Sequence, residues 1–213
     1  MPSLVHALIV ARPDGRIPAA LHLKRTLAAL DAQTRRVDEL TVVLCGADDA
    51  LHDLAAASGA EAVISAPAST TYAKAIALGL RRVEPGSMIW LLAQDTAPEP
   101  EALARLAGVL ELSPSLAIVA PKLVRWADRD HIVSLGVTMT RFGRAVGLAD
   151  GEYDQGQHDG DDDVLGSDVR GVLLRAEASE SFLPDPALAG ADEGLDMGVR
   201  ARLGGWRISL VPR

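Results

Sequence analysis

The stretch of residues 90–100 reads Trp-Leu-Leu-Ala-Gln-Asp-Thr-Ala-Pro-Glu-Pro. It continues a short apolar run that begins at Met88, and a run of this length predicts a buried strand. Pro98 suits the first turn of a helix, and the pattern that follows extends to Leu112. The stretch therefore predicts a strand, a loop and a helix, with Asp95 in the loop just past the end of the strand.

The same succession of apolar run, turn and helical pattern occurs three times before this stretch. The predicted strands of the first half are Leu4–Ala11, Leu40–Cys45, Ala62–Ser65 and Met88–Leu92. The predicted helices are Pro18–Gln33, Leu51–Ser58, Tyr72–Val83 and Pro98–Leu112. Because the strands are apolar throughout, both faces of the sheet must be covered, which indicates an α/β fold with mostly parallel strands and helices on both faces. Such sheets bind ligands beyond the carboxyl ends of their strands, so the loops that follow these strands form the expected site.

The second half of the chain differs, with a long polar loop over Gly143–Gly166. Its predicted strands are Leu116–Pro121, Val133–Thr140, Val169–Leu174 and Ile208–Val211. A helix is predicted over Asp192–Leu203, because its apolar residues recur at helical spacing. No linker divides the chain, so we expect a single domain over residues 1–213. Its end beside a strand suggests a piece of a longer protein.

Composition excludes several classes of protein. The 213 residues carry a formal net charge of −8, which argues against a nucleic-acid partner, since such a partner needs a basic face. A bound divalent cation would still let acidic side chains hold an anionic nucleotide. The single cysteine, Cys45, rules out an intrachain disulfide and is expected to be buried. No signal peptide or membrane-spanning stretch is visible, and the Gly-rich motifs of dehydrogenases and P-loop enzymes are absent.

The stretch 90–100 resembles the metal-binding motif of family 2 glycosyltransferases with the GT-A fold, which in one bacterial subgroup reads Trp-Leu-Leu-His-Asp-Asp-Ser-Ala-Pro-Glu-Pro. The similarity continues in the same order through residues 28–37, 102–106, 113–115, 121–122, 136–138, 141–143 and 151–160. The order and spacing of these segments together make the resemblance specific. It implies a GT-A-like, Rossmann-like α/β domain with a nucleotide-binding half over 1–112 and an acceptor-side half over 113–213.

The resemblance also implies a divalent cation, Mg or Mn, that bridges the protein and the diphosphate of a nucleotide sugar. Asp95 falls on the last acid of the family motif, which implies that it is the metal ligand. Ala93 and Gln94 fall on the two preceding positions, where the carboxylates have been lost. Magnesium commonly keeps several waters, so one carboxylate with the diphosphate would hold it more weakly. The alternative is that Asp95 or Thr96 only caps the following helix.

A second constellation lies at residues 192–200, which resemble the family run Asp-Asp-x-Asp-Phe-Gly-Trp-Arg at the start of the helix that carries the catalytic base. Glu193 falls on the first acid, Gly194 on the second and Asp196 on the third. Because an inverting transfer needs a carboxylate to accept the proton of the acceptor hydroxyl, Glu193 is the expected base. The alternative is that these acids only complement the helix dipole. If only lost acids silence the site, Gly194→Asp together with Gln94→Asp is expected to restore activity.

Further candidates for binding the nucleotide sugar come from the other loops. Asp48 follows the second strand, shifted from the place where the resemblance implies an acid that contacts the base, and Asp14 is a further candidate in the loop after the first strand. Gln94 accompanies Asp95 in the motif, and Gly171 falls where the family has a small residue beside the acceptor pocket. His158 is a candidate for contact with phosphate or metal, or else a solvated surface histidine. The acidic run at 161–163 reads as a solvated loop, because no calcium-loop spacing follows it.

The resemblance carried by these residues implies inverting transfer of a glycosyl group from a nucleoside-diphosphate sugar to a saccharide or lipid-linked acceptor, without a covalent intermediate. One rival is an inactive binding or scaffolding module that kept the fold, favoured by Ala93, Gln94 and Gly194. A weaker rival is a nucleotidyltransferase, for which residues 12–16 supply a poor Gly-rich loop. Relatives are often membrane-anchored proteins of cell-envelope polysaccharide assembly. We therefore expect a cytoplasmic chain that meets the membrane only through regions outside this sequence.

Overall fold

The computed structural model of the chain describes residues 3–13, 18–160, 163–179, 182–188 and 192–212. The strands are β1 (Val5–Ala11), β2 (Glu39–Cys45), β3 (Ala62–Ala66), β4 (Met88–Ala93), β5 (Leu116–Pro121), β6 (Leu123–Val124), β7 (Ile132–Ser134), β8 (Val137–Met139), β9 (Ala145–Gly147), β10 (Leu173–Arg175) and β11 (Arg207–Val211). The helices are α1 (Ala19–Asp31), α2 (Asp49–Ala56), α3 (Tyr72–Leu80), α4 (Ala102–Leu112), α5 (Ala176–Ser179), the short 3₁₀ turn η1 (Pro186–Leu188) and α6 (Glu193–Leu203).

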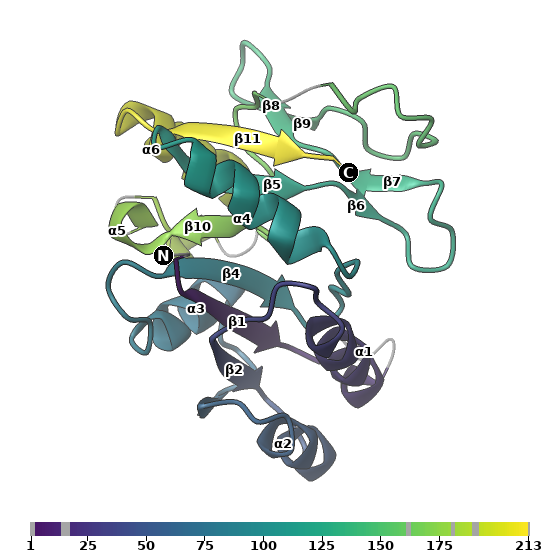
Figure 1. The fold of residues 1–213 in the computed structure, drawn as a ribbon, viewed down its shortest axis with the longest axis vertical. Helices are drawn as coiled ribbons and strands as arrows, with labels where there is room; N and C mark the ends of the chain where they lie inside the picture. Colours follow the sequence, from purple (N-terminus) through teal and green to yellow (C-terminus); the bar gives the residue numbers. More distant parts are fainter. Residues whose placement is uncertain (1–2, 14–17, 161–162, 180–181, 189–191, 213) are drawn as a thin grey trace.

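Seven of the strands form one central sheet in the order β11-β5-β10-β4-β1-β2-β3 (Figure 1). Neighbouring strands are parallel except for β10, which runs antiparallel to both β4 and β5. The mostly parallel α/β sheet expected from the sequence is thus confirmed. The direction of β10 matters for the site, because its amino end lies at the same edge as the carboxyl ends of the other strands.

Helices cover both faces of this sheet, as the uniformly apolar strands require. Alternate residues of each strand point to opposite faces, so β1 sends Leu8 and Val10 to one core and Ala7 and Ile9 to the other. The first core is closed by α3, α5 and α6, and the second by α1, α2 and α4. Cys45 is buried in the first core as predicted, and burial raises the pKa of its thiol.

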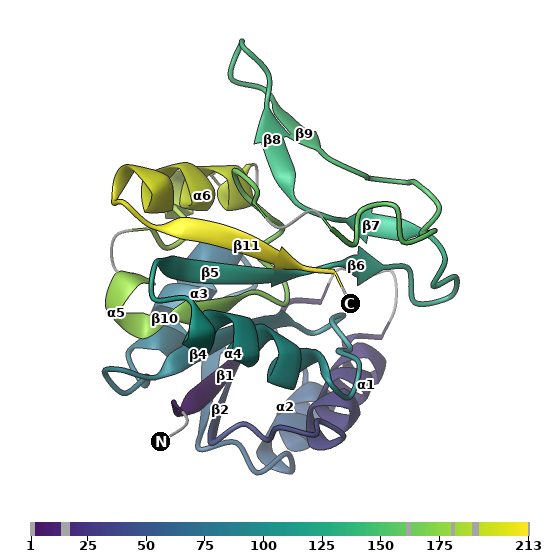
Figure 2. The same cartoon turned by 45° about the horizontal axis from the view of Figure 1, so that its top comes forward.

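Two small two-stranded sheets stand outside the central one, β6 with β7 and β8 with β9. Figure 2 shows the β8–β9 hairpin projecting away from the body of the molecule, beside α6. The sequence predicts one strand over Val133–Thr140, but Gly136 adopts a φ of +74° and divides it into β7 and β8. A side chain at Gly136 would also collide with Val164, at 2.8 Å from its Cγ1. The predicted polar loop over Gly143–Gly166 contains β9, which pairs with β8.

The helix predicted from Pro98 begins four residues later, at Ala102. Pro100 disfavours helical backbone at the residue before it, which delays the start. The intervening segment is held instead by the turn after α1, where Gln33 Nε2 donates to the carbonyl oxygen of Glu99 over 2.8 Å. The loop after β4 is therefore longer than predicted, which leaves Asp95 well clear of the helix.

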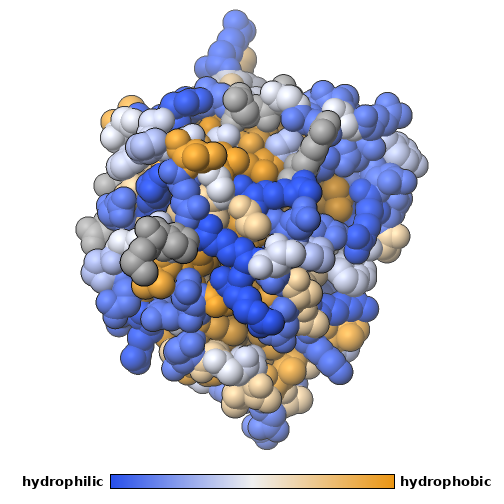
Figure 3. All heavy atoms as spheres, viewed as in Figure 1, coloured by the Kyte–Doolittle hydropathy of each residue, from blue (hydrophilic) through white to orange (hydrophobic). Residues whose placement is uncertain are grey.

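On the face seen in Figure 3, hydrophobic residues form small patches among hydrophilic ones. Within the described residues, no helix combines the length and the apolar character needed to cross a bilayer.

Candidate functional site

The candidate site lies at the edge of the sheet where the parallel strands end. Asp95 follows β4, which ends at Ala93. The loop that carries Asp168 and Arg170 precedes β10, and because β10 is antiparallel this loop reaches the same edge. We call Asp95, Asp168 and Arg170 the rim cluster. The two halves of the chain thus meet at this cluster.

Arg170 is the centre of the rim cluster. Its Nε donates to Oδ1 of Asp168 over 3.0 Å and its Nη2 to Oδ2 of the same carboxylate over 2.6 Å. Its Nη1 lies 3.6 Å from Oδ2 of Asp95, an ion-pair distance longer than a hydrogen bond. The hydrogen bond to Asp168 raises the pKa of the guanidinium, so Arg170 stays charged. Asp168 therefore fixes the orientation of Arg170, and Asp95 faces the remaining edge of the guanidinium.

Tyr72, the first residue of α3, extends this group. Its hydroxyl is buried, and burial raises the pKa of the phenol. The charges of Asp168, Asp95 and Glu193 raise that pKa further, while Arg170 lowers it. These effects fall off with distance, so Asp95, Asp168, Arg170 and Glu193 all lie within electrostatic range of one phenol.

Glu193 opens α6 and is only 5% exposed. It lines a cleft of about 350 Å³ together with Asp168, Asp150 and residues of the β8–β9 hairpin. Partial burial raises the pKa of the Asp150 carboxyl, and the charge of Asp168 raises it further. Asp168 belongs both to this cleft and to the rim cluster, so the cleft and the rim are adjacent parts of one site.

Gly194 cannot be replaced by the acid that the family motif has there without moving the backbone. A Cβ atom at Gly194 would lie 1.7 Å from the carbonyl oxygen of Ser167. One turn later, a Cβ at Gly198 would lie 2.0 Å from the carbonyl oxygen of Leu165. The expectation that Gly194→Asp restores an acid is therefore wrong, because the segment at 165–168 occupies the space that its side chain would need.

Gln94 is buried at the start of the loop after β4. Its side-chain Nε2 donates to the carbonyl oxygen of Arg12 over 2.7 Å. Its backbone carbonyl oxygen accepts from Thr26 Oγ1 over 2.6 Å. Gln94 thereby ties the end of β1 and the helix α1 to the rim. Its role as a direct ligand stays a prediction.

The remaining predicted binding residues lie in several places. Asp48 is the N-cap of α2 and accepts from the backbone N–H of Leu51 over 2.9 Å. His158 lies in the long segment after β9, with Nε2 3.1 Å from Oε2 of Glu152. Asp14 lies outside the described residues. The binding roles of these three residues stay predictions.

Gly171 has a structural reason to be glycine. Its φ is +81°, and a Cβ there would lie 2.9 Å from Cγ of Pro121. Its N–H donates to the carbonyl oxygen of Leu91 over 2.7 Å, and its carbonyl oxygen accepts from Nε1 of Trp90 over 3.0 Å. These two bonds fasten the loop that carries Arg170 to β4.

The residues present do not fit a metal ion held by several protein ligands. Asp95 is the one acid kept from the family motif, and its carboxylate faces a guanidinium. Among the described residues, no group of three or more His, Cys, Asp or Glu side chains is arranged to hold a metal ion. The capping alternative for Asp95 and Thr96 is wrong as well, because the N-cap of α4 is Glu101.

Sequence reasoning missed Tyr72, Asp168 and Arg170. The predicted strand Val169–Leu174 placed Arg170 inside the sheet, whereas β10 begins only at Leu173. A signal was available in Asp168 and Arg170, two opposite charges next to an apolar run. What the sequence lacked was the antiparallel direction of β10, which brings the loop to the rim.

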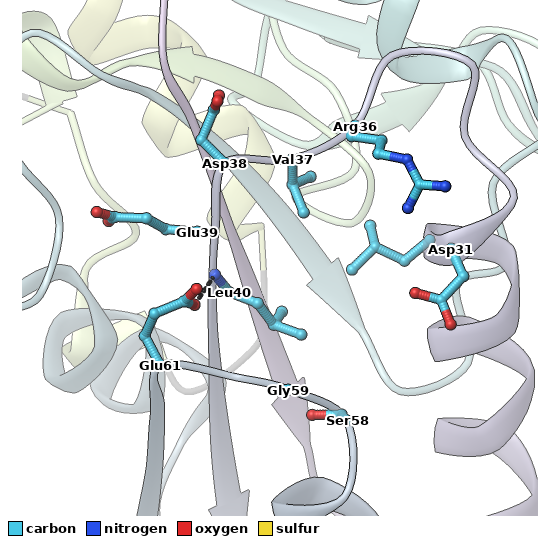
Figure 4. A pocket seen from close by; sticks show the side chains of 10 residues that line it. Asp31, Arg36, Val37, Asp38, Glu39, Leu40, Ser58, Gly59 and Glu61 are labelled. Carbon is cyan, nitrogen blue, oxygen red and sulfur yellow. Dashed lines mark hydrogen bonds between the residues drawn. The ribbon is translucent and has the colours of Figure 1, made fainter.

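Another cavity, of about 170 Å³, lies at the opposite end of the sheet, where β2 begins (Figure 4). Asp31, Asp38, Glu39 and Glu61 line it together with Arg36. Oε2 of Glu61 accepts from the backbone N–H at the start of β2 over 2.5 Å, as the dashed line in Figure 4 shows. Glu61 is thus engaged in holding strand ends together, and this cavity lies away from the carboxyl-end rim.

Comparisons with known structures agree with this fold. GalNAc-T7, in a crystal structure with UDP, GalNAc and Mn²⁺, is 12% identical with a TM-score of 0.74, over 99% of this chain and 42% of that one. TarS from S. aureus is 15% identical with a TM-score of 0.63, over 98% of this chain and 35% of that one. This chain thus spans less than half the length of either protein, and the likeness shows a shared GT-A fold.

Sequence comparison gives the family. No curated protein sequence matches this chain. The family model described as "Glycosyltransferase like family 2" matches residues 2–213, nearly the whole chain. The chain therefore belongs to the glycosyltransferase family 2-like proteins.

Proposed function

We propose that this domain transfers a sugar, with inversion, from a nucleoside-diphosphate sugar to a saccharide or lipid-linked acceptor. The observation that carries the proposal is the meeting of the rim cluster with the cleft of Glu193 through one shared residue, Asp168. Open α/β sheets bind nucleotides at this edge. The donor would lie along the rim and the acceptor in the cleft, with the reacting atoms between them.

In this arrangement Glu193 is the general base. The acceptor hydroxyl attacks the anomeric carbon while Glu193 takes its proton, and the bond from that carbon to the diphosphate breaks. The diphosphate leaves with the electron pair, so no covalent enzyme intermediate forms. Burial of Glu193 at the wall of the cleft supports this role, because water is kept from competing with the acceptor.

The divalent cation expected from the resemblance has no assigned step in the proposed reaction. The GalNAc-T7 structure contains Mn²⁺ with UDP. In this chain, Asp95 alone of the motif acids remains, and its carboxylate is beside Arg170. No step of the proposed reaction is therefore routed through a metal held by this protein.

Binding of nucleotides tests the proposal directly. Calorimetry with uridine, guanosine, adenosine and cytidine diphosphates, each with and without Mn²⁺, is expected to show binding of at least one of them. Absence of heat across the whole panel at millimolar ligand would contradict it. Transfer is then tested with the matching nucleotide sugar and a panel of saccharide and lipid-linked acceptors.

The second candidate is a binding module that keeps the fold without the chemistry. The observation in its favour is the tight packing of Gly194 against Ser167, which leaves no space for the second acid of the family motif. The two candidates differ in hydrolysis: a weakened enzyme still cleaves its nucleotide sugar slowly when Mg²⁺ or Mn²⁺ is present. Binding without any cleavage would favour the module.

The setting of the reaction is proposed from the resemblance alone. We infer that the domain acts in assembly of cell-envelope polysaccharide on the cytoplasmic side, as part of a longer membrane-anchored protein. Location of the tagged full-length protein in cell fractions tests this, and recovery outside the membrane fraction would contradict it.

A further inference from the structure

In the rim cluster, the guanidinium of Arg170 lies beside the motif positions at which the family has acids. Two of the three motif positions, Ala93 and Gln94, carry no carboxylate, and the side chain of Gln94 is bound to the carbonyl oxygen of Arg12. The third, Asp95, faces Nη1 of Arg170 at 3.6 Å. The positive charge next to the one remaining acid of the motif is thus a side chain of the protein itself.

Arg170 is also held in a way that suits an anion. Asp168 accepts from Nε and Nη2, which leaves the donors of Nη1 directed toward Asp95 and the rim. The side chain is 35% exposed, so a ligand can reach it. A guanidinium fixed on one edge presents its other donors in a planar fork that matches the oxygens of a phosphate.

We propose that the guanidinium of Arg170 binds the diphosphate of the donor and stabilises it as the leaving group, in place of a divalent cation held by the protein. The inference rests on the proposed function, because it names the group that holds the donor in that site. As the bond to the anomeric carbon breaks, negative charge grows on the diphosphate oxygen, and a fixed guanidinium stabilises that charge without reorganisation.

The inference gives Asp95 a role opposite to that of a metal ligand. Arg170 carries one positive charge between the two carboxylates of Asp168 and Asp95, so the diphosphate has to displace Asp95 from the guanidinium. Asp95 then competes with the ligand. Removing its charge should tighten metal-free binding, whereas a metal ligand would be needed for binding.

Calorimetry of nucleoside diphosphates with the full chain in EDTA tests this with three variants. Wild type is expected to bind without metal, and Arg170→Gln is expected to bind about 10-fold more weakly or worse, because a hydrogen bond to a charged group is lost. Asp95→Asn is expected to bind about 2- to 5-fold more tightly, as the loss of a partly exposed ion pair predicts. Arg105→Gln, which removes an exposed arginine on α4, is the matched control and should bind like wild type.

The outcomes separate this inference from the proposed function. Binding that requires Mn²⁺ and disappears in Asp95→Asn would overturn the inference and leave the sugar-transfer proposal intact. Absence of nucleotide binding by wild type, both with and without Mn²⁺, would overturn both proposals. Should Arg170→Gln be poorly folded by circular dichroism, the sign of the change in Asp95→Asn decides, since tighter and weaker binding point to opposite roles.

Discussion

Gly194, in the first turn of α6, lies so close to Ser167 that a Cβ atom would come within 1.7 Å of the Ser167 carbonyl oxygen. The contact sets the distance between α6 and the loop that leads to Arg170. It also explains why an acid is missing from this position, since the backbone of the loop takes its place. Glycine is required here by the neighbouring segment at Ser167, while its own backbone is helical.

Gly194→Ala is expected to lower the free energy of unfolding by about 1–3 kcal/mol or more, as for overpacked sites, because one of two backbones must move. The matched control is Gly108→Ala in α4, where a Cβ would meet nothing within 4 Å. That change should stabilise the protein by about 0.5–1 kcal/mol through helix propensity. Urea denaturation of both variants provides the measurement, and equal behaviour would contradict the packing described here.

Glu193→Gln is expected to lower turnover by about 10²–10⁴-fold while nucleotide affinity stays the same, because glutamine keeps the shape but cannot accept a proton. Asp196→Asn is the control on the same helix. Asp196 pairs with Arg200, with Nε 2.9 Å from its carboxylate, and is expected to affect stability more than turnover. Steady-state kinetics of both variants decides, and full activity in Glu193→Gln would remove it as the base.

Trp90→Phe should act on the site through the loop of Gly171. The indole N–H bonds the Gly171 carbonyl, and the whole side chain is 1% exposed, so phenylalanine leaves that carbonyl without its donor. An expected loss of about 1–3 kcal/mol in unfolding free energy follows from the buried unpaired group. Nucleotide affinity should fall too, because Arg170 is the next residue. Trp126→Phe, at a residue 58% exposed, serves as control and should change neither quantity.

Stability should depend on pH through Glu111. A hydrogen bond from Arg35 is the largest cause that lowers the pKa of this carboxyl below its ordinary value. The pair therefore stabilises the fold at neutral pH, and the contribution is lost as the pH falls through the lowered pKa of the folded state. Glu111→Gln is expected to cost about 0.2–1 kcal/mol at pH 7 and progressively less as the pH is lowered toward 2.

Thermal unfolding across that range measures the difference between Glu111→Gln and wild type. Glu101→Gln removes a more exposed pair with Arg105 on the same helix and should have a smaller effect. A constant difference between Glu111→Gln and wild type at all pH values would show that packing, rather than charge, is responsible.

The first half of the fold was predictable because its signals are local. Strands such as Met88–Ala93 are continuous apolar runs, and turns with Pro and Gly mark their ends. The placement of Asp95 just past β4 and of Glu193 at the start of α6 follows from the same signals. What these residues do chemically rests on the family resemblance, which supplied the positions of the motif acids.

The position of Arg170 at the rim could not be predicted from the sequence, for a physical reason. Whether a short strand runs parallel or antiparallel depends on contacts with distant strands, such as Leu173 with Trp90 and Val119, and leaves no mark in local periodicity. The close approach of Gly194 to Ser167 could not be predicted from the sequence either. A glycine in a helical pattern looks like a lost acid, and only the fold shows that Ser167 occupies its space.

The antiparallel placement of β10 next to β5 has a consequence for how such domains can diversify. β5 ends at Pro121 beside the start of β10 at Leu173, so the segment between them leaves and re-enters the sheet at nearly one point. Chain length inserted between two fixed neighbouring points costs little closure entropy, growing only slowly with length. The exposed turn at residues 140–144, between β8 and β9, can therefore be lengthened, shortened or exchanged as a cassette while the sheet and the loop of Arg170 stay unchanged. We expect that grafting this cassette between related domains would carry acceptor preference with it and leave the donor nucleotide the same.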